Sequence, residues 1–121
     1  MIAAYLPRET VHTRVRRAWS EHVAPALEVT DQGLMLSALV VASTCVDEIV
    51  AAEGYPGPRA GARLWIARRS FSQFDALVEA RRMRNRAVHH LDYRLHHQGY
   101  VGALASFAVA LRDHGLALGD G

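Results

Sequence analysis

Residues 34–50 constrain the fold more than any other part of the chain, because a helix made from them would be apolar on nearly every side. A thin polar strip runs through Ser37, Thr44 and Glu48. A helix with so little polar surface has to lie in the middle of a bundle or at a subunit interface. Polar side chains interrupt the apolar stretch often enough to indicate a buried helix rather than a membrane span.

Two more helical segments are predicted, one before and one after the long apolar helix. One begins after Leu6-Pro7, has apolar residues every three or four positions, and ends or kinks at Pro25. Thr30 and Asp31 can cap the long apolar helix over about residues 32–53, which stops at the glycine- and proline-rich turn 54–58. A short helical segment is expected over 59–69.

Two further helices complete the prediction. Residues 72–75, Ser-Gln-Phe-Asp, are typical of a capping box that opens a helix running towards the nineties. The last helix ends near Gly115 and has one apolar face, formed by Tyr100, Leu104, Phe107, Ala108 and Leu111. Short connections between long helices favour antiparallel neighbours. We therefore expect a single all-α domain over residues 1–121, folded as a four- to five-helix antiparallel bundle.

Composition is that of an ordinary globular protein, half apolar and 21% charged. The single cysteine, Cys45, cannot form an internal disulfide and is expected to be a small buried apolar residue. Trp19 and Trp65 are interpreted as core or interface aromatics. The N-terminus has no basic segment followed by an apolar run, so we expect no signal peptide, no membrane contact and a cytoplasmic location.

Positive charge is concentrated in one segment. Residues 59–94 carry nine arginines against three acidic residues, a net charge of +6, whereas residues 1–58 have a net charge of −3. All 14 basic residues are arginines, whose planar guanidinium suits phosphate better than an ammonium group does. The segment therefore has the charge expected of a polyanion-binding surface. A GC-rich genome would produce the same preference for arginine.

The helix that begins near residue 72 changes character in its second half. One face carries, in order, Phe74, Leu77, Val78, Arg81, Arg84 or Asn85, Val88 and Leu91. Burying an unpaired arginine is very costly. We therefore expect these arginines to line a crevice, to face a second subunit, or to pair with acidic residues, for which Asp47 and Glu48 are the best candidates. The simpler alternative is a face exposed to solvent, with the solubilising charges Arg81, Arg82, Arg84 and Arg86.

Residues 84–89, Arg-Asn-Arg-Ala-Val-His, resemble the signature of the HEPN superfamily. That signature is an arginine, four to six intervening residues and a histidine, often with a polar residue directly after the arginine, here Asn85. The motif also lies late in a long helix and precedes one more amphipathic helix, as in that family. Asn85 and His89 would share a helical face, whereas Arg84 and His89 would lie about 140° apart. Arg84 and His89 converge only if the helix bends or ends, or if two copies meet.

The resemblance implies a metal-independent endoribonuclease that needs no cofactor, acts as a homodimer and leaves a 2′,3′-cyclic phosphate. It would be a toxin or a defence or stress ribonuclease, with an antitoxin or regulatory protein as a further partner. Arg84 would hold the scissile phosphate and His89 would transfer protons. Asn85 would orient the histidine or the phosphate. The RNA backbone would be bound by Arg81, Arg82, Arg86 and His90. The toxin branch has a tyrosine two residues after the histidine; this chain has Leu91 there, and its nearest tyrosine is Tyr93.

Three other interpretations stay open. The chain would fit a non-catalytic HEPN-like module that binds RNA or a nucleotide, or a structural or regulatory bundle that dimerises through residues 34–50. The third is a metal site formed by His89, His90, His96 and His97. These two pairs would align on a continuous helix, but about 10 Å of rise is too far for ligands of one ion.

Overall fold

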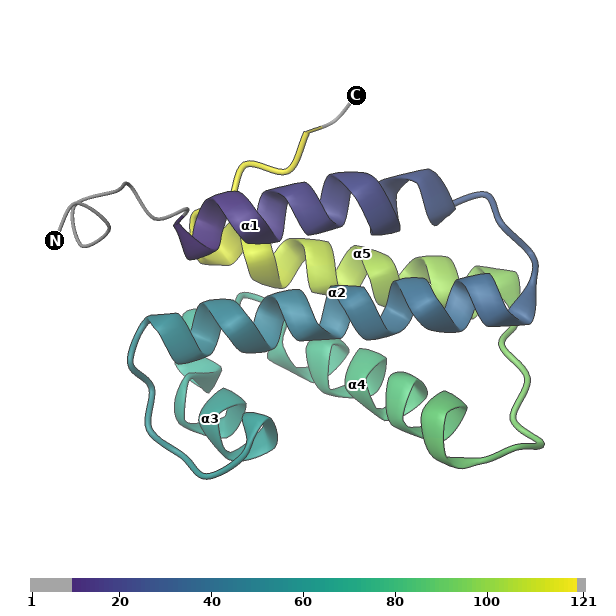
Figure 1. Ribbon diagram of the computed structural model, residues 1–121. Coiled ribbons are helices and arrows are strands. Elements are labelled where there is room, and N and C mark those ends of the chain that lie inside the picture. The colour runs from purple at the N-terminus through teal and green to yellow at the C-terminus, as the bar shows by residue number, and fades with distance from the viewer. Residues whose placement is uncertain (1–9, 120–121) are drawn as a thin grey trace, which may run out of the picture.

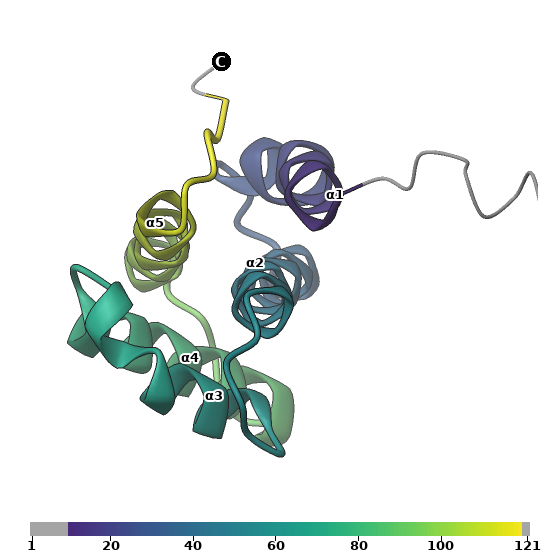
Figure 2. The same ribbon diagram turned by 90° about the vertical axis from the view of Figure 1, so that its left-hand side faces the viewer.

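Helix α2 (Gln32–Ala52) lies in the middle of the molecule, as its apolar sequence predicts. In the computed structural model, which describes residues 10–119, α2 packs against α1 (Val11–Ala18), α3 (Ala60–Ile66), α4 (Phe74–His89) and α5 (His97–Asp113). Figure 2 shows α1 on one side of α2, α3 and α4 on the opposite side, and α5 beside it. The described residues contain no strand, which confirms the all-α bundle.

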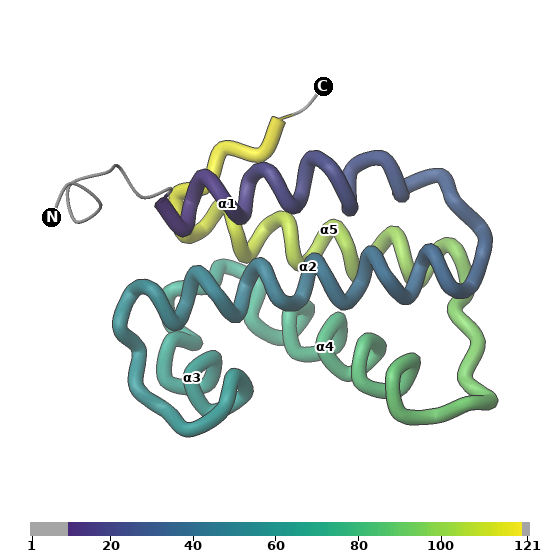
Figure 3. The backbone as a smooth tube through the Cα atoms, viewed as in Figure 1, coloured from purple at the N-terminus to yellow at the C-terminus, as the bar shows by residue number. Residues whose placement is uncertain are grey.

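The long helices alternate in direction along the chain. Figures 1 and 3 show α2 running back beside α1, and α5 running back beside α4. The short α3 and a 3-10 turn (Arg68–Ser70) connect α2 to α4. This order places the end of α4, which carries residues 84–89, at the opposite end of the bundle from the end of α2.

Local signals fix both ends of α2. The Asp31 carboxylate accepts a hydrogen bond from the Leu34 backbone N–H at 2.9 Å, as expected of the predicted cap. After Ala52 the chain turns at Gly54, whose φ of +86° is a left-handed conformation that favours glycine. By length and composition α2 is apolar enough to cross a bilayer, a property it shares with core helices of soluble proteins and with signal sequences, and half of its apolar stretch is buried inside the bundle.

The first helix deforms before it ends. The Thr10 hydroxyl accepts from the Thr13 N–H, and α1 continues into a π turn (Trp19–Val23) and a 3-10 turn (Ala24–Ala26) that contains Pro25. Proline thus ends the helix where it was predicted to. Trp19 is buried in the core, which confirms its interpretation. The predicted start of this helix, after Pro7, lies outside the described residues.

The predicted capping box at residues 72–75 is wrong. Helix α4 begins at Phe74 behind Gln73, which provides no side-chain cap. The backbone N–H and the hydroxyl of Ser72 instead donate to the Asp113 carboxylate, at 2.8 and 2.9 Å. Because this carboxylate lies at the end of α5, a tertiary contact has replaced the local one.

The loop that follows α4 is held by a side chain from α2. The helix ends at His89, and the chain then crosses to α5 through residues 90–96. Within this loop the Leu95 N–H donates to Gln32 Oε1 and the Leu95 carbonyl accepts from Gln32 Nε2, both at 2.8 Å. Tyr100, on the predicted apolar face of α5, is buried and donates its hydroxyl to the Ala26 carbonyl at 2.5 Å.

Candidate functional site

The residues of the HEPN-like motif lie in the last two turns of α4. Arg84 is partly buried, whereas Asn85 and His89 are exposed. Arg84 Nη1 donates to Asn85 Oδ1 at 3.1 Å, so the two adjacent side chains are joined. The helix is regular α-helix to His89. Arg84 and His89 therefore lie about 140° apart around the helix axis and about 7.5 Å apart along it. The two side chains do not converge within one chain.

An acidic partner for the arginines comes from α2. Asp47 Oδ1 accepts from Arg81 Nη1 at 2.6 Å, and their side chains are only 25% and 20% exposed. Of the two acidic residues expected to neutralise the arginines, Asp47 therefore does so. Glu48 does not: it pairs with Arg14 of α1 at 3.5 Å, because the next residue along α2 points to another side of the helix.

Three guanidinium groups surround this one carboxylate. Burial raises the pKa of Asp47 above its ordinary value, and the positive charges of Arg81, Arg84 and Arg63 oppose that rise. The Nε atoms of Arg63 and Arg84 are buried and have no hydrogen-bond partner among the described residues. Arg63 Nη1 donates to the Gly57 carbonyl at 3.0 Å, which carries no formal charge. The cluster of Asp47 with these three arginines thus keeps an excess of positive charge.

The four residues expected to bind the RNA backbone do not form one patch. Arg81 points to α2 and is held by Asp47. Arg82 is exposed and pairs with Glu79 at 2.6 Å on its own helix. Arg86 and His90 are exposed near the end of α4. Arg81 and Arg82 line one groove together, whereas Arg86 lines a different hollow, between α4 and α5, and His90 a third, at the end of α4.

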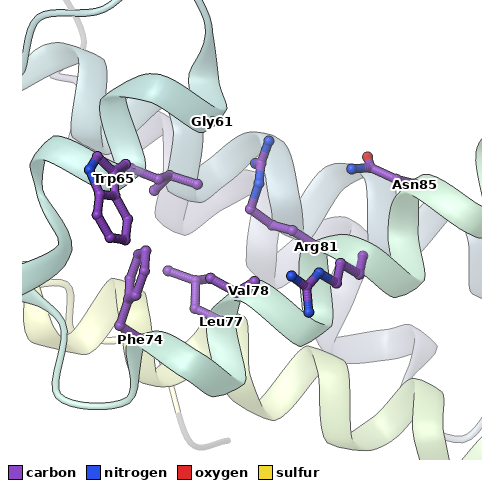
Figure 4. A pocket seen from close by; sticks show the side chains of 9 residues that line it. Gly61, Trp65, Phe74, Leu77, Val78, Arg81 and Asn85 are labelled. Atoms are coloured by element: carbon purple, nitrogen blue, oxygen red, sulfur yellow. The ribbon is translucent and has the colours of Figure 1, made fainter.

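A groove begins beside the motif and is lined in part by Arg81 and Arg82, so the crevice that was one of the expectations for these arginines is present. The Trp65 groove, as we call it, has a volume of about 290 Å³ and is lined by Gly61, Leu64, Trp65, Phe74, Leu77, Val78, Arg81, Arg82 and Asn85. Figure 4 shows Trp65 and Phe74 at one end and Arg81 and Asn85 at the other. Trp65 is 59% exposed, so in the single chain it is not a core residue. The pattern around it, Leu64-Trp65-Ile66, gave no sign that the indole faces solvent.

A second hollow of about 290 Å³ lies where α4 ends, between the start of α2 and the loop to α5. Its lining mixes polar and apolar side chains and includes Val88, His90, Leu91 and Tyr93. Leu91 is fully exposed and Val88 is 40% exposed. Two large apolar side chains therefore flank His89 in the sequence without being covered by the bundle.

The histidines do not assemble as a metal site. His89 ends α4, whereas His97 begins α5 and hydrogen-bonds through Nδ1 to the Val29 carbonyl at 3.0 Å. The continuous helix on which the two pairs would align is therefore not formed. Among residues 10–119 no group of three or more His, Cys, Asp or Glu side chains is placed to hold a metal ion.

A serine, a histidine and a glutamate form a hydrogen-bonded chain at the other end of the bundle. His114 Nδ1 lies 2.6 Å from Glu53 Oε2, and its Nε2 lies 2.8 Å from Ser70 Oγ. This is the connectivity of a hydrolase triad, but Ser70 already donates its one proton to the Ala67 carbonyl at 2.6 Å. The Ala67 carbonyl therefore competes with His114 for the proton of the Ser70 hydroxyl. The chain joins the ends of α2 and α5 to the turn after α3.

No family model matches the chain, and comparisons with curated proteins and with solved structures find no significant match.

Proposed function

We propose that the protein is a metal-independent endoribonuclease of the HEPN type, with Arg84, Asn85 and His89 as its catalytic residues. The observation that carries the proposal is the state of Arg84. It is partly buried in a cluster with excess positive charge, and it donates to the neutral Asn85 rather than to a carboxylate. A guanidinium held in this way can bind a phosphate without first breaking an ion pair.

The reaction uses a nucleophile that belongs to the RNA. His89 removes the proton of a ribose 2′-hydroxyl, and the 2′-oxygen forms a bond to the adjacent phosphorus. The bond from phosphorus to the 5′-oxygen breaks, and that oxygen takes up a proton, so the products are a 2′,3′-cyclic phosphate and a 5′-hydroxyl. Arg84 donates to the phosphate oxygens and stabilises their added charge. Proton transfer of this kind contributes about 10²–10⁴-fold to the rate.

A homodimer would complete the site. Since Arg84 and His89 point about 140° apart on one helix, a second copy is needed to bring an arginine and a histidine to the same phosphate. The exposed Val88 and Leu91 on either side of His89 provide the apolar contact for such a partner. Arg82, Arg86 and His90 would then bind the RNA backbone next to the paired motifs, and this binding would weaken with salt. We also propose that the protein acts in the cytoplasm and that an antitoxin or another regulatory protein controls it.

The second candidate is a non-catalytic HEPN-like module that binds RNA or a nucleotide. The excess positive charge around Asp47 supports it equally well, because attraction of a phosphate needs no proton transfer. The two candidates differ in what His89 does. In the binding module, replacing His89 changes affinity at most, whereas in the enzyme it abolishes cleavage.

The deciding experiment is cleavage of end-labelled single-stranded RNA by the purified protein in EDTA. Wild type, Arg84→Ala and His89→Ala are compared with His12→Ala, a matched control whose histidine is exposed on α1, across α2 from α4. We expect wild type and His12→Ala to give fragments that end in a cyclic phosphate, and the other two variants to give none. A folded wild-type dimer that binds RNA and does not cleave it would refute the enzyme and favour the binding module.

A further inference from the structure

The Trp65 groove combines an apolar surface with an end lined by Arg81 and Arg82, each paired with one carboxylate, next to the excess positive charge of the Asp47 cluster. Its aromatic end is formed by Trp65 and Phe74, whose ring centroids are 6.2 Å apart. Arg68 holds the indole in place, with its guanidinium carbon 4.1 Å from the ring centroid and its Nη1 donating to the Trp65 carbonyl at 2.8 Å. The aromatic pair therefore presents a fixed, partly exposed platform rather than a flexible side chain.

The opposite end of the groove meets the motif. Asn85 lines the groove and also accepts the hydrogen bond from Arg84, so the groove and the candidate phosphate site share a side chain. Arg81 and Arg82 line the same end. Figure 4 shows Arg81 and Asn85 at the end away from the aromatic rings. A ligand that fills the groove thus has a flat apolar part at one end and negative charge at the other.

We propose that the aromatic end of the Trp65 groove binds one unstacked base of single-stranded RNA, and that the RNA backbone continues from there along α4, past Arg81 and Arg82, towards Asn85. Nucleotides have the flat ring and the adjacent negative charge that this groove requires, and base–aromatic stacking tolerates every base. At about 290 Å³ the groove is just below the range of about 300–1,000 Å³ usual for small-molecule sites, which suits one nucleotide. That the backbone leads from this nucleotide to the scissile phosphate at Arg84 rests on the proposed ribonuclease function.

Gly61 offers a way to close the groove without disturbing the fold. It is exposed on α3 and lines the groove, and a Cβ added there has no heavy atom within 4 Å. In Gly61→Leu the side chain would occupy the space of the base, whereas Gly61→Ala is the matched control with a small side chain. Trp65→Ala removes the platform directly, and the exposure of Trp65 keeps that change out of the core.

The test measures binding without cleavage. The probe is a labelled thymidine tetradeoxynucleotide, which lacks the 2′-hydroxyl that the proposed reaction needs, and its affinity is measured by fluorescence anisotropy. An abasic tetramer of equal charge and inorganic phosphate are the control ligands. We expect Trp65→Ala and Gly61→Leu to weaken tetramer binding about tenfold or more, and Gly61→Ala to leave it unchanged. The tetramer and not the abasic chain should quench tryptophan fluorescence, and Trp65→Phe should remove that quenching, since Trp19 is buried.

The outcomes separate this inference from the ribonuclease. Equal affinity of wild type, Trp65→Ala and Gly61→Leu would overturn the base-binding groove even if RNA is cleaved. Quenching by the tetramer without any cleavage of RNA would support the groove and refute the enzyme. A change in Trp65 fluorescence that follows protein concentration without added oligonucleotide would show that a second copy fills the groove, which also overturns the inference. Circular dichroism and urea unfolding of each variant confirm that the fold is intact.

Discussion

Replacing Asp47 by asparagine keeps the shape of the side chain that accepts from Arg81 and removes its charge. Its effect depends on two opposing terms. The 2.6 Å hydrogen bond to Arg81 is charge-assisted and mostly buried, which stabilises the fold. Burial has the opposite effect, because it removes the charged carboxylate from water. Burial raises the pKa of Asp47 despite the three neighbouring arginines, so the loss of hydration destabilises the charged carboxylate more than the arginines stabilise it.

We therefore expect Asp47→Asn to change the free energy of unfolding by less than about 1 kcal/mol, since asparagine still offers Arg81 an acceptor. Asp47→Ala leaves the partly buried Arg81 without that acceptor and should cost about 1–3 kcal/mol. In a domain of this size that corresponds to about 4 °C of melting temperature per kcal/mol. Urea unfolding of the three proteins measures the difference. If asparagine costs as much as alanine, the charge and not the acceptor stabilises the pair, and the reasoning is refuted.

The same comparison has a pH dependence of known sign. Because folding raises the pKa of Asp47 above 3.8, the folded protein takes up this proton at a higher pH than the unfolded chain does. Wild type should therefore gain stability relative to Asp47→Asn as the pH falls through the raised value towards 3.8. Both variants should also bind single-stranded oligonucleotides more tightly at low salt. If Arg81 then contacts a phosphate, the slope of log affinity against log salt steepens by about 0.7.

Three further predictions concern other parts of the molecule. Burial raises the pKa of the Cys45 thiol from 9.0 to about 12, so iodoacetamide at pH 8 should modify it only as fast as the protein unfolds. The stability of wild type should fall relative to Cys45→Ala as the pH rises from about 9, by up to about 1.4 kcal/mol per pH unit, and rapid labelling of the native protein would contradict this. Leu91→Asp should leave the circular dichroism spectrum unchanged, because Leu91 is fully exposed. In sedimentation this variant should be a monomer, and it should no longer cleave RNA. A monomer that still cleaves RNA would refute the proposed shared site. Ser70→Ala should cost about 1 kcal/mol in urea unfolding through the bond to His114 and leave RNA cleavage intact, whereas ester hydrolysis that disappears in this variant would assign the serine a catalytic role.

The sequence predicted those features that a single helix determines. The apolar residues of α2 required a central position, Asp31 capped that helix locally, and Pro25 ended the one before it. The acidic partner of the arginines was predicted as Asp47 or Glu48 because carboxylates are rare on α2. Only the packing angle of α4 against α2 decides that Asp47 reaches Arg81 while Glu48 faces Arg14.

Features that need two elements were missed. A serine at position 72 is compatible with a capping box and with a contact to α5. The sequence alone does not indicate that Asp113 lies close enough to accept its hydrogen bonds. Trp65 is apolar and has apolar neighbours, so its pattern resembles that of a core residue. Its exposure follows from the shortness of α3, which buries Leu64 and leaves the next two side chains outside. The Trp65 groove exists only because α3 and α4 meet at that place.

The two hydrogen bonds between Gln32 and Leu95 satisfy the backbone N–H and the carbonyl of Leu95, as a neighbouring strand does for a residue in a sheet. One side-chain amide supplies the acceptor and the donor that a peptide unit would supply, so a loop residue is anchored on both sides by a residue of the first turn of α2. The stretch from His90 to Leu95 is consequently tied at one end to α4 and at the other to α2. Replacing Gln32 by glutamate would keep the acceptor and remove the donor, and would loosen the segment next to His89 while leaving every residue of the motif in place. The alignment of the face that carries Leu91 is thus set by Gln32, 52 residues upstream of Arg84, the first residue of the motif.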